Sequence, residues 1–302
     1  MGDEIKWFIG IDGGGTGCRA VLSDALANVL STAESGPSNI MTNFANAQNN
    51  LLQLVDQVMQ NASIAPSEID RTALVIGVAG ANVGNNAQQL NSALPFTHCA
   101  IETDARVSLE GALGKADGVV VIIGTGSVFV SRVNGEYATK GGWGHIVSDT
   151  GSGAVLGKQL LREALLHHDN IHNGSSLTTR VLNQFNHQPE SIVEFANSAE
   201  PFAFAEFAAD IVDAARSKDS VALSLMRNAA SDMEPIINAM LPGQTMPLCL
   251  LGKLGKCYAP YLPQTMQQRL VEPLNTAEYG ALALALARFS NNKLKHNANE
   301  QH

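Results

Sequence analysis

The sequence predicts an α/β protein of two lobes, for three reasons. A strand, a glycine-rich turn and a returning strand occur twice, starting at Trp7 and at Val119. Between and after these hairpins, short apolar runs alternate with segments of helical spacing, which is typical of sheets with parallel strands and covering helices. The chain has 302 residues, which is long for one hydrophobic core and comfortable for two.

The composition narrows the class of protein. Hydrophobic residues make up 45% of the chain and charged residues 16%, and the net charge of −9 argues against nucleic-acid or anionic-membrane partners. No signal peptide and no apolar run of about 18 residues is present, so we expect a cytoplasmic protein without a membrane span. The cysteines form no Cys-x-x-Cys pair, so we expect reduced thiols and no structural zinc or iron–sulfur cluster. They are Cys18, Cys99, Cys249 and Cys257.

The first hairpin carries an acid and a cluster of glycines. An apolar strand over 7–11 ends in Asp12, and the glycines lead to a second β-type run over 19–22. Consecutive glycines let backbone N–H groups converge into a nest for phosphate, while Asp12 and Thr16 can serve a hydrated Mg²⁺ and phosphate oxygens. The turn is neither a P-loop, because the required Lys is missing, nor a dinucleotide fingerprint, because a strand follows it. A plain glycine-rich turn beside a surface acid is the alternative.

The rest of the first lobe alternates strands and helices. Asn39 ends a Ser-Gly-Pro-Ser-Asn segment and is a turn residue on the plain interpretation. Asp104 stands at the C-terminal end of a strand, where open α/β sheets place ligands, but Asp is also among the best helix N-caps. The residues alone leave these two interpretations of Asp104 equal. We expect strands over 29–34, 72–79 and 99–102, and helices over 43–62, 86–93 and 105–113.

The second hairpin opens the second lobe. An apolar strand over 119–123 runs into the turn Gly124-Thr125-Gly126-Ser127 and returns over 128–133 to an Asn134-Gly135 turn. A duplicated fold with a nucleotide between two lobes needs two such turns facing each other. Chance recurrence is the alternative, but the pair is more specific than either turn alone.

A loop of unusual composition follows over 141–153. It holds five glycines in thirteen residues, together with Trp143, His145 and Asp149. A Trp face with a neighbouring carboxylate suits a sugar, whose CH faces stack and whose hydroxyls form hydrogen bonds. The alternative is a structured hairpin with a buried Trp. A metal site at His145 and Asp149 is disfavoured because no further ligands stand at suitable spacing, which leaves His145 as a hydrogen-bonding or structural residue.

The remainder of the chain is mostly helical. A strand over 247–251 ends in Gly252, which puts another ligand-competent turn at a strand end. Small residues open a final helix over 276–289, where they permit close approach to another helix or to a nucleotide. The tail from Ser290 is polar, and we expect it to be disordered. We expect further helices over 154–168, 178–185, 190–197, 204–215 and 220–240, with Pro235 placed to kink the last.

Taken together, these motifs resemble those of the N-acetylglucosamine kinases of the BadF/BadG/BcrA/BcrD ATPase family, within the sugar kinase, actin and heat-shock-chaperone superfamily. The resemblance covers 5–288, and its most specific part is Gly-Gly-Trp-Gly-His with Asp-x-Gly-Ser-Gly over 141–153. The other motifs are Asp12 to Thr16, Ser38-Asn39, Thr103-Asp104, Gly124 to Ser127, Gly252 to Gly255 and Glu278 to Ala281.

The resemblance implies a two-lobed actin-like ATPase (ribonuclease H-like) fold with nucleotide and sugar in the cleft between the lobes. The N-terminal lobe would be 1–116 and the C-terminal lobe 117–289, followed by a disordered tail over 290–302. The last helix would pack back on the N-terminal lobe. A homodimer is suggested by the family alone.

The resemblance also implies a role for each matching residue. Asp104 would accept the proton of the sugar 6-hydroxyl, and Asp12 would lie near the Mg²⁺, through water. The turn that approaches adenosine often reads Gly-Gly in the family, whereas here it reads Gly252-Lys253, which weakens that assignment. The ATP-binding residues would be Gly13, Gly14, Gly15, Thr16, Gly124, Thr125, Gly126 and Gly252. The sugar-binding residues would be Asn39, Asp104, Trp143, Gly144, His145 and Asp149.

The implied function is ATP-dependent phosphorylation of N-acetylglucosamine, with Mg²⁺ and ATP as the required partners. Glucosamine or glucose is the near alternative, because nothing in the sequence fixes the substituent at C2. A nucleotide-driven activator of a partner reductase is a further alternative, but it typically brings an iron–sulfur cluster on paired cysteines. A nucleotide-sensing or filament-forming protein would have no reason to carry the Trp143 and Asp149 loop.

Overall fold

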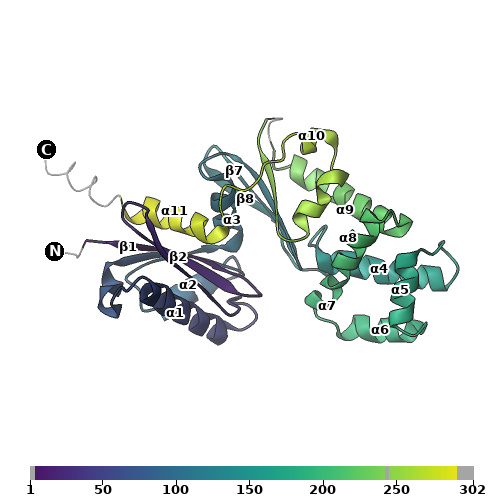
Figure 1. Ribbon diagram of the computed structural model, residues 1–302, viewed down its shortest axis with the longest axis horizontal. Helices are drawn as coiled ribbons and strands as arrows, with labels where there is room; N and C mark the ends of the chain where they lie inside the picture. Colours follow the sequence, from purple (N-terminus) through teal and green to yellow (C-terminus); the bar gives the residue numbers. More distant parts are fainter. Residues whose placement is uncertain (1–3, 242–244, 291–302) are drawn as a thin grey trace. The chain divides into compact units, whose positions relative to one another are not determined.

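A computed structural model describes residues 4–241 and 245–290 and divides into two compact units (Figure 1). Unit 1 consists of Met1–Ala116 and Pro273–His302, and unit 2 of Asp117–Glu272. The final helix belongs to unit 1 in this division, whereas the predicted range 117–289 includes it, with the expectation that it packs back on the N-terminal lobe. The tail predicted over 290–302 lies outside the described residues, apart from Ser290.

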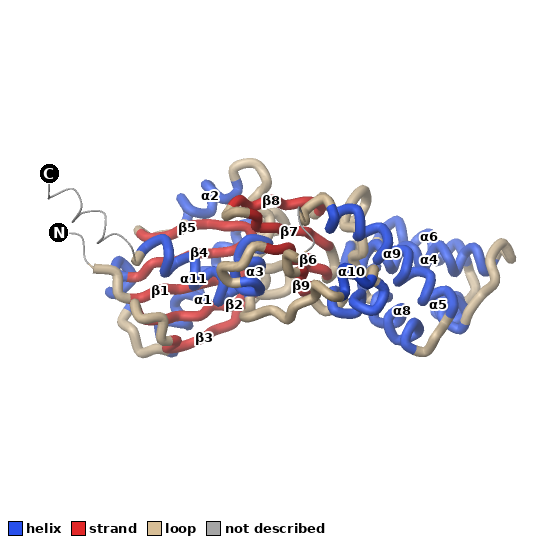
Figure 2. Tube along the Cα trace, turned by 90° about the horizontal axis from the view of Figure 1, so that it is seen from above, coloured by secondary structure: helices blue, strands red, loops and turns tan. Residues whose placement is uncertain are grey.

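The sheet of unit 1 has the strand order β3-β2-β1-β4-β5 in the described part of the chain (Figure 2). The first three strands form an antiparallel meander, and β4 and β5 run parallel to β1. The carboxyl ends of β1, β4 and β5 consequently share one edge of the sheet. The bounds are β1 (Trp7–Gly13), β2 (Cys18–Asp24), β3 (Val29–Ser35), β4 (Thr72–Val78) and β5 (His98–Thr103).

Helices cover both faces of this sheet because successive residues of a strand point to opposite sides. Ile9 and Ile11 of β1 belong to the core beneath α1 and α2, whereas Phe8 packs with residues of α3 and α11. Figure 1 shows α1 and α11 on opposite sides of the strands. The bounds are α1 (Phe44–Asn61), α2 (Asn86–Ala93), α3 (Asp104–Leu113) and α11 (Ala277–Phe289), with a short 3₁₀ helix η1 (Pro66–Arg71) before β4.

The small residues at the start of α11 permit contact with protein backbone. A Cβ on Gly10 of β1 would collide with the backbone of Glu278 and Leu282. A Cβ on Gly280 would likewise collide with the backbone of Val107 and Gly111 in α3. Close approach to another helix, one of the two alternatives that the sequence left for this helix, is therefore present, and approach to a nucleotide stays a prediction.

Unit 2 repeats part of the same topology. Its sheet has the order β8-β7-β6-β9, in which β6, β7 and β8 form an antiparallel meander and β9 returns parallel to β6. The first four strands of unit 1 are arranged in the same way, so the repeated hairpin belongs to a repeated fold. Asn134 and Gly135 both have positive φ, as their two-residue hairpin turn requires. The bounds are β6 (Gly118–Ile123), β7 (Ser127–Val133), β8 (Glu136–Gly141) and β9 (Leu248–Leu251).

The body of unit 2 is helical and shares one hydrophobic core with the sheet. The single helix predicted over 204–215 is wrong, because two helices are separated at Glu206. The first of these helices, α7, lies tightly on α4, because Cβ atoms on Gly153 and Gly157 would collide with Ala205 and Phe204. Pro235 lies inside α9 without ending it. The helices are α4 (Gly153–His168), α5 (Ser176–Gln184), α6 (Pro189–Ser198), α7 (Pro201–Ala205), α8 (Phe207–Arg216), α9 (Ser220–Asn238), η2 (Gly255–Tyr261) and α10 (Gln264–Gln267).

Over the described ranges, no helix combines the length and the apolar character needed to cross a bilayer.

Candidate active site in two parts

Two acids far apart in sequence meet at one edge of the unit 1 sheet. Asp12 lies near the end of β1, and Asp104 follows directly on β5. The register places Asp12 opposite Gly77 of β4, and Gly77 opposite Glu102 of β5, so a single strand separates the two acids. Asp12 shares the sheet face of Phe8 and Gly10, which is covered by α3 and α11. Both predicted acids therefore belong to one site.

Hydrogen bonds hold the first glycine turn in place. The N–H of Gly14 donates to the carbonyl of Gly17 at 3.0 Å and closes the hairpin. The N–H of Ser38 donates to the carbonyl of Gly14 at 3.0 Å, and that of Ala79 to the carbonyl of Gly13 at 3.0 Å. These bonds tie the turn to the loop that carries Asn39 and to the end of β4.

Gly15 has no packing reason to be glycine. Its φ is not positive, and a Cβ built on it would meet no atom within 4 Å. Gly13 differs, because a Cβ there would lie 2.5 Å from the Oγ of Ser38. Gly15 and Thr16 are exposed at the tip of the turn. Contacts within the described chain therefore do not require glycine at this position, which leaves room for a ligand to approach the backbone N–H groups.

Asp104 does not cap α3. The cap is Thr103, whose Oγ1 accepts the N–H of Arg106 at 3.1 Å. Asp104 is the first helical residue, and its Oδ1 accepts the N–H of Ala105 at 2.8 Å. Burial raises the pKa of the Asp104 carboxyl, and the hydrogen bond from Ala105 partly offsets this. The structure thus removes the cap role for Asp104, and its chemical role stays a prediction.

Negative charge accumulates around Asp12. Its pKa is raised to about 7, mainly by burial and further by the carboxylates of Asp104 and Glu278, against a smaller opposing effect of Arg19. Glu278 is only 8% exposed. A divalent cation would relieve this repulsion, and carboxylate oxygens are the ligands that Mg²⁺ prefers. The donor set of unit 1 therefore fits a magnesium ion.

Asn39 sits in the loop fastened to the first glycine turn. Its Oδ1 accepts the N–H of Met41 at 2.9 Å, which forms an Asx turn before α1. None of the hydrogen bonds found in the described ranges uses its amide nitrogen. A half-buried Asn with a spare donor can bind a sugar hydroxyl or carbonyl.

The second glycine turn in unit 2 is fastened to the start of α4. The N–H groups of Gly153 and Ala154 donate to the carbonyls of Gly124 and Thr125 at 2.8 and 3.1 Å. Gly124 and Thr125 are exposed, and a Cβ on Gly124 would meet no atom within 4 Å. These two bonds fix the turn against the N-terminus of α4. Gly124 resembles Gly15 in having no internal reason to be glycine.

Asp149 links this turn to the loop over 141–153. One carboxylate oxygen accepts the N–H of Gly144 at 3.1 Å, and the other lies 2.9 Å from a Cβ built on Gly126. Asp149 is buried and has a φ of 55°, which is uncommon outside glycine. Burial raises the pKa of its carboxyl, whereas the Gly144 hydrogen bond and His145 lower it. The structure thus brings Gly126, which the sequence assigned to phosphate, together with Gly144 and Asp149, which it assigned to the sugar.

Trp143 and His145 differ in their surroundings. The Trp143 side chain is 74% exposed, so the alternative of a hairpin with a buried Trp is wrong. The His145 ring lies 6.2 Å from the ring of Phe204, and its carbonyl accepts the Nζ of Lys158 at 3.3 Å. These contacts agree with a structural part for His145, while Trp143 offers an open aromatic face.

Gly252 has a reason to be glycine within the fold. Its φ is +84°, and a Cβ would collide with the carbonyl of Ile123 at the end of β6. The neighbouring Lys253 is exposed. Contact with adenosine therefore stays a prediction at this turn, because chain packing alone accounts for the glycine.

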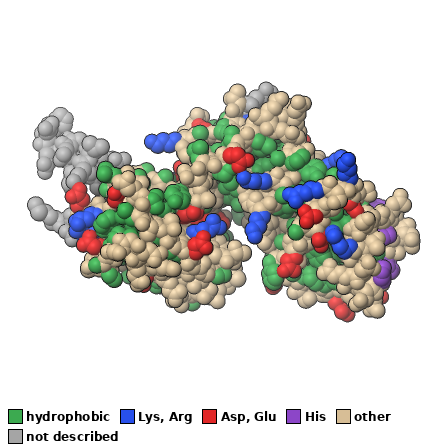
Figure 3. Space-filling view, in the orientation of Figure 1, with side chains coloured by type: hydrophobic (Ala, Val, Ile, Leu, Met, Phe, Trp, Pro, Cys, Tyr) green, Lys and Arg blue, Asp and Glu red, His purple; other side chains and the backbone are tan. Residues whose placement is uncertain are grey.

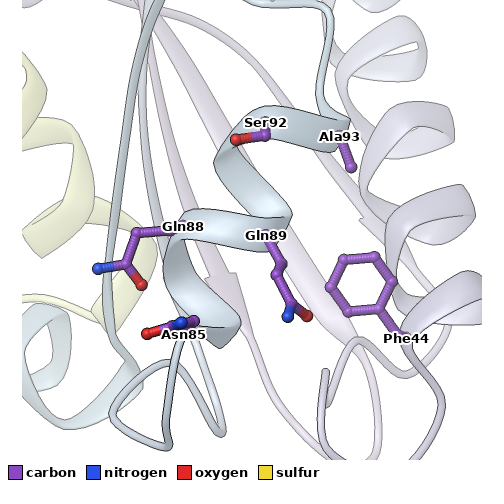
Figure 4. Close-up of a pocket in the computed structure, with 6 residues that line it drawn as sticks. All are labelled: Phe44, Asn85, Gln88, Gln89, Ser92 and Ala93. Atoms are coloured by element: carbon purple, nitrogen blue, oxygen red, sulfur yellow. The ribbon is translucent and has the colours of Figure 1, made fainter.

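A separate depression of about 730 Å³ lies between α1 and α2 (Figure 4). Phe44 and Gln89 face each other across it, and the other lining residues are Asn85, Gln88, Ser92 and Ala93. The polar side chains among them are amides and a hydroxyl, which can form hydrogen bonds but are not acids or bases at neutral pH. On the face shown in Figure 3, acidic and basic side chains are also interspersed rather than gathered by sign. The depression therefore offers groups for binding but no acid or base for catalysis.

One residue near the site received no role from the sequence. Glu278 stands in a motif noticed for its small residues, and the structure buries its carboxylate within the electrostatic reach of Asp12. The feature of the sequence that could have indicated Glu278 is its position as an acid in the first turn of a helix whose other early residues include glycine and alanine.

Comparison with known proteins gives consistent matches. The model of the BadF/BadG/BcrA/BcrD ATPase family matches residues 9–269. A glucosamine kinase from Vibrio cholerae is 30% identical over 282 residues, which are 93% of this chain and 96% of that protein. An N-acetylmuramic acid/N-acetylglucosamine kinase from Clostridium acetobutylicum is 32% identical over 171 residues, 55% of each chain. A solved structure from Chromobacterium violaceum, proposed to be an N-acetylglucosamine kinase, has a TM-score of 0.85 and 32% identity and covers 93% of this chain and 99% of its own.

Proposed function

The chain belongs to the BadF/BadG/BcrA/BcrD ATPase family, and from this premise we propose that it is an ATP-dependent kinase that phosphorylates the 6-hydroxyl of an amino sugar. The observation that carries the proposal is the acid pair Asp12 and Asp104, one strand apart beside a glycine turn that packing does not explain. The predicted two-lobed α/β fold is confirmed by the repeated sheet topology and by the Chromobacterium violaceum structure.

N-acetylglucosamine is the substrate that we propose. The exposed ring of Trp143 offers a stacking face, and the proposed sugar contacts are Asn39, Gly144, His145 and Asp149. Glucosamine is the second candidate, because the Vibrio cholerae relative that matches along almost its whole length is named for that sugar. The two sugars differ by an acetyl group and, at neutral pH, by the positive charge of the free amine.

The proposed mechanism depends mainly on alignment of the sugar hydroxyl with the γ-phosphate and on neutralisation of the phosphate charge. Gly13, Gly14, Gly15 and Thr16 hold the β- and γ-phosphates, and Gly124, Thr125 and Gly126 make the second phosphate contact. Gly252 approaches the adenosine. Mg²⁺, when bound near Asp12, neutralises the phosphate charge.

Asp104 acts as the base in this proposal. A sugar hydroxyl is a weak acid, so the carboxylate orients it toward the γ-phosphate and takes its proton late in the transfer. The raised pKa of Asp104 supports this part, because a buried carboxylate binds a proton more readily than an exposed one.

The proposed cellular location and partners follow from the reactants. An enzyme that uses ATP and an amino sugar belongs in the cytoplasm, where ATP is available, and needs neither nucleic acid nor membrane as a partner. A homodimer is part of the proposal on the family resemblance alone, and light scattering during gel filtration tests it.

ADP release tests the whole proposal. Purified protein with Mg-ATP is given N-acetylglucosamine, glucosamine, glucose or no sugar in parallel, and each product is checked for a phosphate at the 6-position. Strong stimulation by one sugar supports the kinase and identifies its substrate. Slow turnover that is independent of sugar would contradict it and favour a nucleotide-driven activator or sensor.

A further inference from the structure

Glu278 is a buried acid with an unsatisfied oxygen. It lies in the first turn of α11 and is 8% exposed. Its Oε1 accepts the hydroxyl of Thr276 at 2.6 Å, whereas its Oε2 is buried without a hydrogen-bond partner. Burial of a carboxylate oxygen without a hydrogen-bond donor or a cation is unfavourable. We therefore expect this oxygen to interact with a bound ligand.

The backbone places Glu278 beside Asp12. Along β1, Phe8 shares a core with Leu282 and Ala285, and Gly10 touches the backbone of Glu278. The strand therefore runs toward the N-terminus of α11 as it approaches Asp12, which lies on the same face of the sheet as Phe8 and Gly10. Helical side chains also lean toward the N-terminus of their helix, which is the direction of Asp12.

The charges around this position are mostly negative. Asp12, Asp104 and Glu278 are close enough to interact electrostatically, and the one cation that interacts with Asp12 in the same way is Arg19. The cluster thus has three carboxylates and one exposed guanidinium. Its excess negative charge and the unsatisfied Oε2 indicate the same kind of missing ligand, a cation.

We propose that Glu278 is a second carboxylate of the magnesium site and helps Asp12 to hold the hydrated Mg²⁺ that accompanies ATP. This inference rests on the proposed kinase function. Within residues 4–241 and 245–290, no three His, Cys, Asp or Glu side chains are grouped to hold a metal ion directly. Glu278 therefore acts on water bound to the ion, which suits Mg²⁺ because it gives up its waters reluctantly.

A structural alternative makes a different prediction. An acid in the first turn of a helix stabilises the positive end of the helix dipole, with or without metal. Under that alternative, loss of the charge weakens the fold equally with chelator and with Mg²⁺. Under the metal-site proposal, loss of the charge relieves repulsion when metal is absent and weakens the gain in stability that metal gives.

The test is the substitution Glu278→Gln, which keeps the size of the side chain and the acceptor for Thr276. Binding of Mn²⁺ to the full chain in the presence of ADP is followed by electron paramagnetic resonance, without any sugar. We expect the affinity for Mn²⁺ to fall by about tenfold or more. Glu68→Gln is the matched control, because Glu68 precedes β4 at the opposite edge of the same sheet and pairs with Lys6 and Arg71. Its Mn²⁺ affinity should be unchanged.

Thermal unfolding supplies the second readout. With a chelator, Glu278→Gln should unfold at a higher temperature than the wild type, and its upward shift on addition of Mg²⁺ and ADP should be smaller. Unchanged Mn²⁺ affinity, or an equal loss of stability with and without metal, would overturn the proposal. If the wild type binds Mn²⁺ with ADP more tightly than the variant but phosphorylates no sugar, only the kinase proposal fails. If the wild type binds no metal with nucleotide, both fail.

Discussion

The hydroxyl of Thr103 accepts the backbone N–H of Arg106 at 3.1 Å, which makes Thr103 the N-cap of α3. Asp104 is consequently the first residue inside the helix and not its cap. It stands at the carboxyl edge of the sheet, one strand from Asp12, and its role as a base is the proposal tested next.

Asp104→Asn should abolish phosphoryl transfer and leave binding largely intact. Asn keeps the acceptor for the N–H of Ala105 but cannot take a proton, so we expect kcat to fall by about 10²- to 10⁴-fold. Thr103→Ala is the control, because it should lower the free energy of unfolding by ~1 kcal/mol through loss of the cap while retaining most of kcat. Calorimetric titration with ATP and sugar decides between the roles of Asp104, since equal losses of binding and turnover would mark it as structural.

Gly15→Ala should weaken ATP binding without changing stability. A Cβ there meets no protein atom within 4 Å, so the fold tolerates it, but the methyl group would stand where phosphate approaches the turn. Loss of one charge-assisted hydrogen bond corresponds to a rise of roughly tenfold or more in KM for ATP. Steady-state kinetics and thermal unfolding check the two parts. Unaltered KM for ATP would remove this turn from the nucleotide site.

Gly252→Ala should lower the stability of the fold, in contrast to Gly15→Ala, which should weaken ATP binding. The positive φ and the contact with the Ile123 carbonyl make this glycine necessary for the end of β9 to lie beside β6. We expect the free energy of unfolding to fall by about 1–3 kcal/mol, measured by urea denaturation. Normal stability combined with poor ATP binding would show instead that Gly252 serves the nucleotide alone.

Asp149→Asn should raise KM for the sugar by about 10- to 100-fold. The amide oxygen of Asn can still accept the N–H of Gly144, so the loop keeps its shape, but the charged acceptor for sugar hydroxyls is lost. KM for ATP should change much less. Asp149→Ala provides the comparison, because it also removes the bond to Gly144. If Asn retains full activity and Ala does not, Asp149 acts only by holding the loop.

The affinity for divalent metal should rise with pH around neutrality. The pKa of Asp12 is raised to about 7, so below pH 7 its carboxyl is mostly protonated and the proton competes with Mg²⁺, whereas above pH 7 it is charged and binds the cation. We expect the apparent Mn²⁺ affinity in the presence of ADP to increase from pH 6 to pH 7 and to level off by pH 8. A flat profile over this range would exclude Asp12 from the metal site.

Much of the candidate site could be predicted because its signals are local. Asp12 and the glycines of the first turn are adjacent in sequence, and the alternation of strands and helices places Asp104 at a strand end. The repeated hairpin also indicated a repeated fold, and the two sheets share that topology. Short segments without a clear period, such as η2 and α10, were missed because the chain pattern there resembles an irregular loop.

Contacts between distant segments could not be predicted in this way. The tight packing of α7 on α4 depends on how closely Gly157 lets Phe204 approach, which no local pattern in either segment reveals. The exposure of Trp143 likewise depends on which residues surround the loop, because a tryptophan in a glycine-rich hairpin fits a core as well as a binding face.

The sequence by itself determined the fold class, the two glycine turns and the two acids, because strand and helix periods and turn chemistry are encoded over a few neighbouring residues. Only the tertiary structure decided which residue caps α3, why Gly15 and Gly252 differ, and that Glu278 is buried near Asp12. The physical reason is that burial, charge coupling and close backbone contact arise between segments brought together by folding. Glu278 and Asp12 stand 266 positions apart in the chain and interact only because α11 lies on β1.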